Sequence, residues 1–278
     1  MRSTGLEPVR SPTRPSNVRV CQFRHDRTTA ITVSYTHLDV YKRQAQTHEN
    51  SQDVVLCSTC FPISIYGIAD GQSNKLFSEL GGKLSLQVAT EYITKHGIEK
   101  LSKVPYKDEI RFHIMTGIRS LLHEKAQECQ TSIYELSSTL VLLAVDLRSG
   151  QYMIVHLGDG VIISVDKEIG VNKNEDAIQI LSPPENGMTP RTTWLTTSES
   201  ALNHLRLCFG NVGHYRRIIL ASDGADSVCR GSNVSHRARK LLVSGSRRDI
   251  GDFISGTSYI DDCSVCVIDT YPMHDIFL

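Results

Sequence analysis

The sequence has few of the features that mark membrane, secreted or nucleic-acid-binding proteins. Lys plus Arg and Asp plus Glu number 30 each, so no net charge attracts nucleic acid or an anionic membrane. No apolar run approaches the roughly 20 residues of a transmembrane helix, and the N-terminus lacks the apolar core of a signal peptide. Aromatic residues make up only 6% of the chain and are not interleaved with basic ones. We therefore expect a cytoplasmic protein without a nucleic-acid or membrane partner.

Several catalytic motifs are also absent. The sequence holds no G-x-S-x-G nucleophile elbow, no P-loop for nucleotide phosphates and no H-E-x-x-H zinc motif. Cys21 and Arg27 have the spacing of the thiolate phosphate loop of tyrosine phosphatases, but no apolar strand precedes them. The match is therefore attributed to chance, and the chemistry has to come from other residues.

The eight cysteines include two C-x-x-C pairs, Cys57 with Cys60 and Cys263 with Cys266. About 200 residues separate the pairs, whereas zinc ribbons separate theirs by roughly 15–20. Cys263 and Cys266 also lie in a strand-like run, where a spacing of three points side chains to opposite faces. We therefore expect free thiols rather than a zinc site or a disulfide framework.

Residues 1–44 differ in texture from the rest of the chain. Residues 10–27 are rich in Arg, Pro and Ser without periodicity, which predicts disorder. The string at 33–44 resembles a translated sequencing adaptor, so we interpret residues 1–44 as a non-native or disordered segment. Residues 45–278 are then a single domain, and on this interpretation the true N-terminus and an edge strand of the sandwich are missing from this chain.

From residue 53 onward the pattern alternates between short apolar runs and two long amphipathic stretches. The short runs predict strands at 53–57, 63–70, 140–146, 152–157, 161–165, 205–209, 217–221 and 263–268. Apolar spacing predicts helices at 79–96, 107–129, 234–243 and 247–254. Residues 167–190, with Gly, Asn and Pro, predict an irregular loop, to which we assign substrate selection. Sheets packed together with helices outside, an α+β fold, are the architecture that this order favours.

Five aspartates lie at predicted strand ends: Asp53, Asp70, Asp159, Asp223 and Asp261. Glycine follows three of them, and its missing Cβ lets the backbone approach an ion closely. Carboxylates with few His or Cys companions favour Mg²⁺ or Mn²⁺ over zinc. Two such ions about 4 Å apart lower the pKa of a water and clamp a phosphoryl group. Taken singly, each aspartate is as well explained as a turn or cap residue.

Six short motifs occur in order along the chain. They are Gln52-Asp53, Gly67-Ile68-Ala69-Asp70-Gly71, Ser138-Thr139, Gly158-Asp159-Gly160, Ala221-Ser222-Asp223-Gly224 and Asp261-Asp262-x-Ser264-Val265. Together they resemble the motif series of the metal-dependent serine/threonine protein phosphatases, the type 2C or PPM family, over residues 47 to 268. The resemblance implies a β-sandwich of two mostly antiparallel sheets flanked by helices, with a two-metal centre at one end.

The same resemblance implies a site and a reaction. Its ligands to two Mn²⁺ or Mg²⁺ ions would be Asp53, Asp70, the Gly71 carbonyl, Asp223 and Asp261, and Asp159 resembles the acid that serves a third ion in some members. The implied reaction is in-line attack of a metal-bridging hydroxide on phosphoserine or phosphothreonine, without a covalent phosphoenzyme. A phosphorylated protein substrate, a partner serine/threonine kinase and a monomeric state follow from the same likeness.

The sequence departs from the family pattern near the expected phosphate. His48 replaces the Arg that commonly binds phosphate, and Gln72 replaces the His proposed as general acid in some members. Ser227 stands where an acid is expected after Asp223, with Asp226 one place early. His156, before Asp159, is interpreted as a core histidine. These departures keep a second hypothesis open, a catalytically weak or inactive regulatory module on the same fold.

Overall fold

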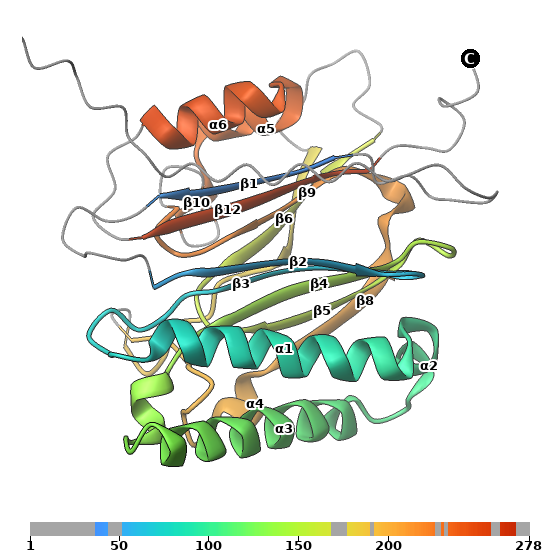
Figure 1. The fold of residues 1–278 in the computed structure, drawn as a ribbon. Coiled ribbons are helices and arrows are strands. Elements are labelled where there is room, and N and C mark those ends of the chain that lie inside the picture. The colour runs from blue at the N-terminus through green and yellow to red at the C-terminus, as the bar shows by residue number, and fades with distance from the viewer. Residues whose placement is uncertain are drawn as a thin grey trace, which may run out of the picture.

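Two antiparallel sheets lie face to face, and helices cover both outer sides (Figure 1). The computed structural model describes the backbone of residues 37–43 and residues 52–167, 177–189, 192–225, 229–230, 233–256 and 262–270. The first sheet contains, in spatial order, β2 (Val54–Cys60), β3 (Ile63–Ala69), β4 (Leu140–Asp146), β5 (Gln151–Leu157) and β8 (Arg206–Asn211). The second contains β1 (His37–Arg43), β12 (Cys263–Asp269), β9 (Tyr215–Ala221), β6 (Val161–Asp166) and β7 (Ile178–Ser182).

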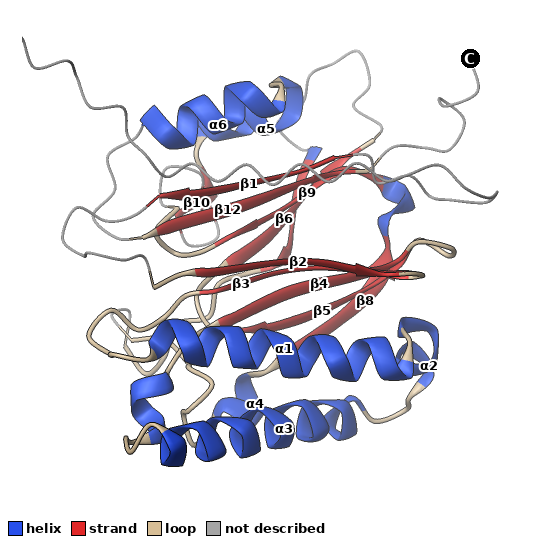
Figure 2. Ribbon diagram, viewed as in Figure 1, coloured by secondary structure: helices blue, strands red, loops and turns tan. Residues whose placement is uncertain are grey.

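Helices form the two outer layers, as the colouring in Figure 2 makes plain. The first sheet is covered by α1 (Ser78–His96), α2 (Ile98–Lys103), α3 (Lys107–Glu128) and α4 (Ala201–His204). The second sheet is covered by α5 (His236–Ser244) and α6 (Arg247–Gly256). Short elements join these layers: the 3-10 helices η1 (Ile133–Leu136) and η3 (Val212–His214), and the hairpin of β10 (Cys229–Arg230) and β11 (Asn233–Val234).

Apolar periodicity explains why these segments adopt these forms. In α3, Ile110, Ile114, Ile118 and Leu122 recur at every fourth position and are all buried against the first sheet. All seven residues of β3 are buried, because this strand packs on α1 with one face and on the second sheet with the other. The expected sandwich of two antiparallel sheets flanked by helices is confirmed.

The placement on opposite faces expected for Cys263 and Cys266 is confirmed. Cys263 packs in the core beneath α5 and α6, whereas Cys266 packs between the two sheets. The two side chains therefore lie on opposite faces of β12, as a spacing of three in a strand requires. Cys57, Cys60, Cys129 and Cys208 take part in no disulfide bond within the described part of the chain.

Several expected boundaries were wrong. Residues 178–182, expected within an irregular loop, form β7 and pair with β6. Their apolar alternation is short and flanked by Gly, Asn and Pro, which hid it in the sequence. β2 continues to Cys60, so the turn to β3 contains only Phe61 and Pro62. The short helices α2 and α4 carry too little periodicity to be predicted.

Within residues 1–44, which we interpret as a non-native or disordered segment, the structure describes one strand. β1 lies within the adaptor-like string and pairs with the edge of β12, from His37 opposite Asp269 to Arg43 opposite Cys263. The non-native origin of residues 1–44 stays a prediction. Residues 44–51, which include His48, and the Cys21–Arg27 spacing lie outside the described residues. No helix in the described ranges combines the length and apolarity needed to cross a membrane.

Candidate active site

Strand register within each sheet and the packing of the two sheets bring three of the predicted aspartates together at one end of the sandwich. Val54 of β2 pairs with Ala69 of β3, so Asp53 and Asp70, one residue beyond each, are neighbours. In the second sheet Ala221 of β9 pairs with Val265 of β12, and Asp223 follows two residues after Ala221. The carboxylates of both sheets therefore converge where these strands begin and end.

Hydrogen bonds join the two sheets at this end. The Ser222 hydroxyl donates to Asp53 Oδ2 at 3.2 Å and accepts from the Ser264 N–H at 3.0 Å. The Gln52 N–H donates to Asp262 Oδ2 at 2.7 Å. Since residues 52–53 precede the first sheet and residues 222 and 262–264 belong to the second, these bonds fix the position of Asp53 relative to both.

The backbone of Asp70 is held from both sides by Thr139. The Asp70 N–H donates to Thr139 Oγ1 at 2.9 Å, and the Thr139 N–H donates to the Asp70 carbonyl at 2.8 Å. Gly71 pairs with Ser138 in an isolated bridge, which continues the β3–β4 ladder past the strand end. The Ser138-Thr139 motif thus serves to position Asp70 and Gly71.

Two glycines are required by the close approach of loops at this end. A Cβ on Gly224 would lie 1.9 Å from the Asp262 carbonyl oxygen, so only glycine lets the Asp223 loop reach β12. Gly158 has φ +111°, and a Cβ there would lie 2.7 Å from Thr139 Cγ2. The glycines in the Asp-Gly and Gly-Asp motifs therefore pack the site as well as turn the chain.

The three carboxylates interact electrostatically. Asp53 is buried, Asp70 is partly buried and Asp223 is exposed, so solvent exposure increases from the first carboxylate to the third. Burial, then the charges of Asp53 and Asp223, and then hydrogen bonds to both raise the pKa of Asp70 well above its ordinary value. Every side chain named among these causes is a carboxylate, so a cation would be strongly attracted to this position.

The donor set fits a hard divalent cation. Carboxylate and carbonyl oxygens are what Mg²⁺ and Mn²⁺ take, and the like-charge repulsion at Asp70 is what such an ion would relieve. Within the described ranges, no three His, Cys, Asp or Glu side chains already have the spacing of a complete metal site. The repulsion at Asp70 shows that the three carboxylates are close to one another. The predicted set also includes Asp261, which lies outside those ranges.

The remaining predicted residues are placed differently. Asp159 lies in the turn between β5 and β6 and is partly buried, and it is not among the groups that shift the pKa of Asp70. Gln72 follows Gly71, and its N–H donates to the Ser137 carbonyl at 3.1 Å. Asp226, Ser227 and His48 lie outside the described residues.

His156 is a buried core residue, as interpreted from the sequence. Ser182 Oγ lies 2.6 Å from its Nδ1, and Arg206 Nη2 lies 3.1 Å from the same nitrogen. A guanidinium only donates, so Nδ1 accepts and the proton of the neutral ring is on Nε2. Burial, followed by the Arg206 charge, lowers the pKa of His156 well below its ordinary value.

Sequence reasoning missed the charged groups around this histidine. Arg206 also donates to the Gly158 carbonyl at 3.4 Å and pairs with Glu185. The Glu185 N–H donates to the same carbonyl at 2.9 Å, and its carboxylate contacts His204. Together, these bonds of Arg206 and Glu185 join β8 to the segment after β7 and to the Asp159 turn. The sequence held no signal for it, because its members are far apart in the chain.

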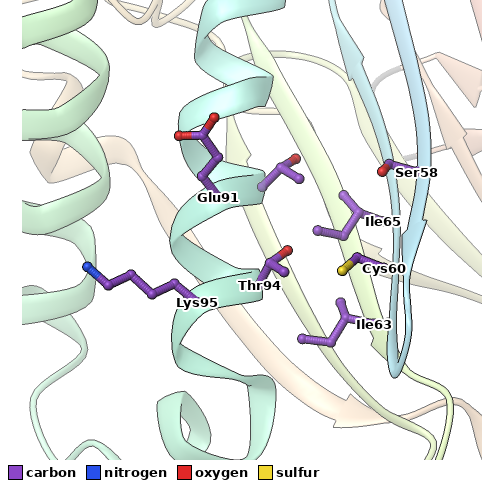
Figure 3. Close-up of a pocket in the computed structure, with 8 residues that line it drawn as sticks. Ser58, Cys60, Ile63, Ile65, Glu91, Thr94 and Lys95 are labelled. Carbon is purple, nitrogen blue, oxygen red and sulfur yellow. The ribbon is translucent and has the colours of Figure 1, made fainter.

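A cavity of about 490 Å³ lies away from the carboxylates. It is located between α1 and the hairpin end of β2 and β3, and Figure 3 shows Thr94 opposite Ile63 and Ile65. Asp53 and Asp70 lie at the other ends of these two strands. The cavity is therefore separate from the candidate active site.

Comparison with solved structures finds the same architecture in bacterial phosphatases. The serine/threonine phosphatase Stp1 from Staphylococcus aureus aligns with a TM-score of 0.62 at 13% identity, covering 91% of this chain and 100% of that one. PppA, described as a key regulatory component of T6SS in Pseudomonas aeruginosa, aligns with 0.59 at 16% identity over 86% and 100%. RsbX in complex with magnesium aligns with 0.56 at 12% identity over 84% and 95%.

At these identities the likeness shows the fold, and the family follows from the sequence. Comparison with curated proteins finds no significant match. The family model described as protein phosphatase 2C matches residues 42–247, which is most of the chain and includes Asp53, Asp70, Asp159 and Asp223. The chain therefore belongs to the protein phosphatase 2C family, which consists of metal-dependent phosphoprotein phosphatases.

Proposed function

We propose that this chain is an active serine/threonine phosphatase that hydrolyses phosphoserine and phosphothreonine in proteins with two Mn²⁺ or Mg²⁺ ions. The observation that carries the proposal is the convergence of Asp53, Asp70 and Asp223, where burial and then the charges of the other two carboxylates raise the pKa of Asp70. A divalent cation bound there would neutralise this repulsion, as a proton on the cluster does when no cation is bound. We assign Asp53, Asp70, the Gly71 carbonyl, Asp223 and Asp261 as ligands.

When bound, two divalent ions would supply a water of lowered pKa for in-line attack and neutralise the phosphoryl oxygens. The chain's own residues hold the reacting groups in place. Ser222 orients Asp53 through Oδ2, and Thr139 fixes the Asp70 main chain. Asp223 is exposed at the mouth, where a phosphorylated side chain can reach it.

Proton transfer to the leaving group is assigned to water. Gln72 stands where some family members carry a histidine, and an amide donates a hydrogen bond without transferring its proton. This substitution favours the second candidate, a weak or inactive module that binds phosphoproteins. We place His48 near the phosphate, Asp159 at a third ion, and the protein in the cytoplasm as a monomer paired with a serine/threonine kinase. Each of these assignments stays a prediction.

The test is hydrolysis of p-nitrophenyl phosphate and of a phosphothreonine peptide by the full chain. We expect turnover with Mn²⁺, none with EDTA, and resistance to vanadate, which inhibits enzymes that form a covalent phosphoenzyme. Asp223→Asn should lower kcat/KM at least a hundred-fold, since even residues that only support a metal ligand typically cost 10–100-fold.

Asp252→Asn is the matched control, because Asp252 is an exposed carboxylate of α6 outside the site. It should retain full turnover. Activity that survives Asp223→Asn would disprove the site assignment. A folded chain that binds Mn²⁺ and phosphopeptide without turnover would instead establish the regulatory-module hypothesis.

A further inference from the structure

Large apolar side chains are exposed at both ends of the sandwich, and the two most exposed lie at the carboxylate end. Met188 is 91% exposed and Leu76 is 86% exposed. Tyr134, at 52%, is near Leu76. The other large exposed apolar side chains among the described residues are Phe61, Tyr106 and Phe112, at the β2–β3 turn and at the start of α3. Single exposed apolar residues are ordinary, but a group beside a reaction centre indicates a contact surface.

Leu76 is held outward by a fixed loop. This loop connects Gly71 to α1, at the end of the sandwich where η1 also lies (Figure 2). Gln52 Nε2 donates to the Lys75 carbonyl at 3.1 Å, which ties the loop to the residue preceding Asp53. The Leu76 N–H donates to Glu135 Oε2 at 3.1 Å. These two bonds hold the peptide group before the Leu76 side chain, and the Phe77 N–H, which donates to the Glu135 carbonyl, holds the peptide group after it. The exposure of Leu76 is therefore a property of the fold.

Tyr134 belongs to the same stretch of surface. It precedes Glu135 in η1, and the Glu135 carbonyl accepts from the Phe77 N–H at 3.2 Å. The Glu135 carboxylate also pairs with Lys75 at 3.3 Å, which neutralises the cation nearest to Leu76. The surface formed by Leu76 and Tyr134 is therefore apolar and has no cation in excess among these residues.

Met188 approaches the site from the segment after β7. Three residues before it, the Glu185 N–H donates to the carbonyl of Gly158, the neighbour of Asp159. Gly187, adjacent to Met188, donates its N–H to the Thr192 carbonyl. The side chain of Met188 is thus carried by a segment that is attached to the turn between β5 and β6.

We propose that Leu76, Tyr134 and Met188 form a docking surface, the apolar rim, for apolar side chains that flank the phosphorylated residue of a protein substrate. The inference rests on the proposed function and adds a substrate class to it. An extended peptide advances about 3.3 Å per residue, so positions two to four residues from the phosphate fall on loops next to the ligands. The cluster of carboxylates, with Lys75 already paired, disfavours acidic flanking residues.

The test compares two phosphothreonine peptides, one with Leu and Phe around the phosphothreonine and one with Ser at the same positions. In the double variant Leu76→Ser and Tyr134→Ser, KM for the apolar peptide should rise about ten-fold while kcat changes less than two-fold. The ratio of kcat/KM for the apolar peptide to that for the serine peptide should approach one. Met188→Ser should shift the ratio in the same direction.

Phe112→Ser is the matched control, because Phe112 is an exposed apolar residue at the opposite end. This variant should retain the wild-type ratio. An unchanged ratio in the double variant, or a wild-type preference for acidic or basic flanking residues, would overturn the apolar rim. Fluorescence anisotropy of the same peptides separates the two proposals. A chain without turnover that still prefers the apolar peptide, and loses this preference in the double variant, refutes the catalytic proposal alone.

Discussion

At one end of the sandwich a buried aspartate faces a cation, while at the other end three aspartates face one another. Asp269 accepts from Arg217 Nε at 2.6 Å, and the same guanidinium donates to the Leu242 and Gly245 carbonyls. Both side chains of this pair are almost fully buried. Asp70, in contrast, has Asp53 and Asp223 as its charged neighbours. The first carboxylate is paired with a cation of the fold, whereas no cationic side chain is among the groups that shift the pKa of the second.

The two ends differ in the groups that hold their carboxylates in place. The Arg217–Asp269 pair is compensated by its own counter-charge and hydrogen bonds, so it contributes to the structure of that end. The carboxylates at the other end are held by Ser222, by Thr139 and by the contact of Gly224 with Asp262. Neutral groups thus fix the positions of charges that repel one another.

The largest expected effect is on the free energy of unfolding, and it is tested by measuring Asp269→Asn and Asp70→Asn side by side. Asp269→Asn leaves the Arg217 charge buried and unpaired, so it should lower the free energy of unfolding by about 3–5 kcal/mol. Asp70→Asn removes one of three like charges, so in EDTA it should leave stability unchanged or increase it.

Urea unfolding in EDTA and in Mn²⁺ measures both variants. Mn²⁺ should stabilise the wild type and Asp269→Asn, but not Asp70→Asn, because binding to the folded state adds stability only where the site is intact. Equal destabilisation of both variants in EDTA would show that Asp70 is stabilised within the fold like Asp269, and the comparison would fail.

Gly224→Ala tests whether the neutral groups around the carboxylates hold them in position. A Cβ at this position meets the backbone oxygen of Asp262, which cannot rotate away, so we expect a loss of about 1–3 kcal/mol of stability. Mn²⁺ affinity should also fall about ten-fold, because the loop that carries Asp223 is displaced. Calorimetric titration with Mn²⁺ measures the affinity.

Gly213→Ala, at the opposite end, is its control. A Cβ there meets the Asn211 side chain, which can move, so Mn²⁺ affinity should stay at the wild-type value. If Gly224→Ala binds Mn²⁺ as tightly as Gly213→Ala does, the packing of this loop is not what positions the ligands.

The strand ends could be predicted from the sequence, and the connections between them could not. Asp53, Asp70 and Asp223 follow or precede short apolar runs. Strand register brings Asp53 beside Asp70, and the packing of the two sheets adds Asp223. Ser222 and Thr139 were visible as motif residues. The Ser222 bond to Asp53 depends on how the two sheets pack, and the Thr139 bond to Asp70 depends on the register of β3 and β4. The Arg206–Glu185 pair joins segments with no shared periodicity, which is why pattern reasoning missed it.

His156 provides a pH test of the carboxylate end. Its pKa in the folded state is lowered, so the unfolded chain binds a proton first as the pH falls below about 6.5. Stability contributed by the neutral ring is complete above pH 6.5 and is lost as the pH falls toward the folded pKa, by up to about 1.4 kcal/mol per pH unit. The charged groups facing this cluster are Arg206 of β8 and Glu185, which also contacts His204 of α4.

His156→Gln keeps a hydrogen-bonding side chain without this titration. The decrease in stability between pH 7.5 and pH 5.5, measured by urea unfolding, should be smaller in the variant than in the wild type. Identical pH dependence in the two proteins would show that His156 takes up a proton in the folded state as readily as in the unfolded chain.

The smallest effect concerns a neutral group at the cavity end. Thr90 Oγ1 is buried without a hydrogen-bond partner in the described part of the chain, and Thr90 lines the same cavity as Ile63 and Ile65. Thr90→Val replaces the hydroxyl by a methyl group of similar shape, so it should stabilise the protein by about 0.5–1 kcal/mol. Thr94→Val, one turn later on α1, should change stability less, because the Thr94 hydroxyl is not among the buried hydroxyls that lack a hydrogen-bond partner. Neither substitution should alter Mn²⁺ affinity, because the cavity lies at the end of the sandwich that holds no carboxylate cluster. A change in Mn²⁺ affinity on Thr90→Val would mean that the two ends are coupled through α1.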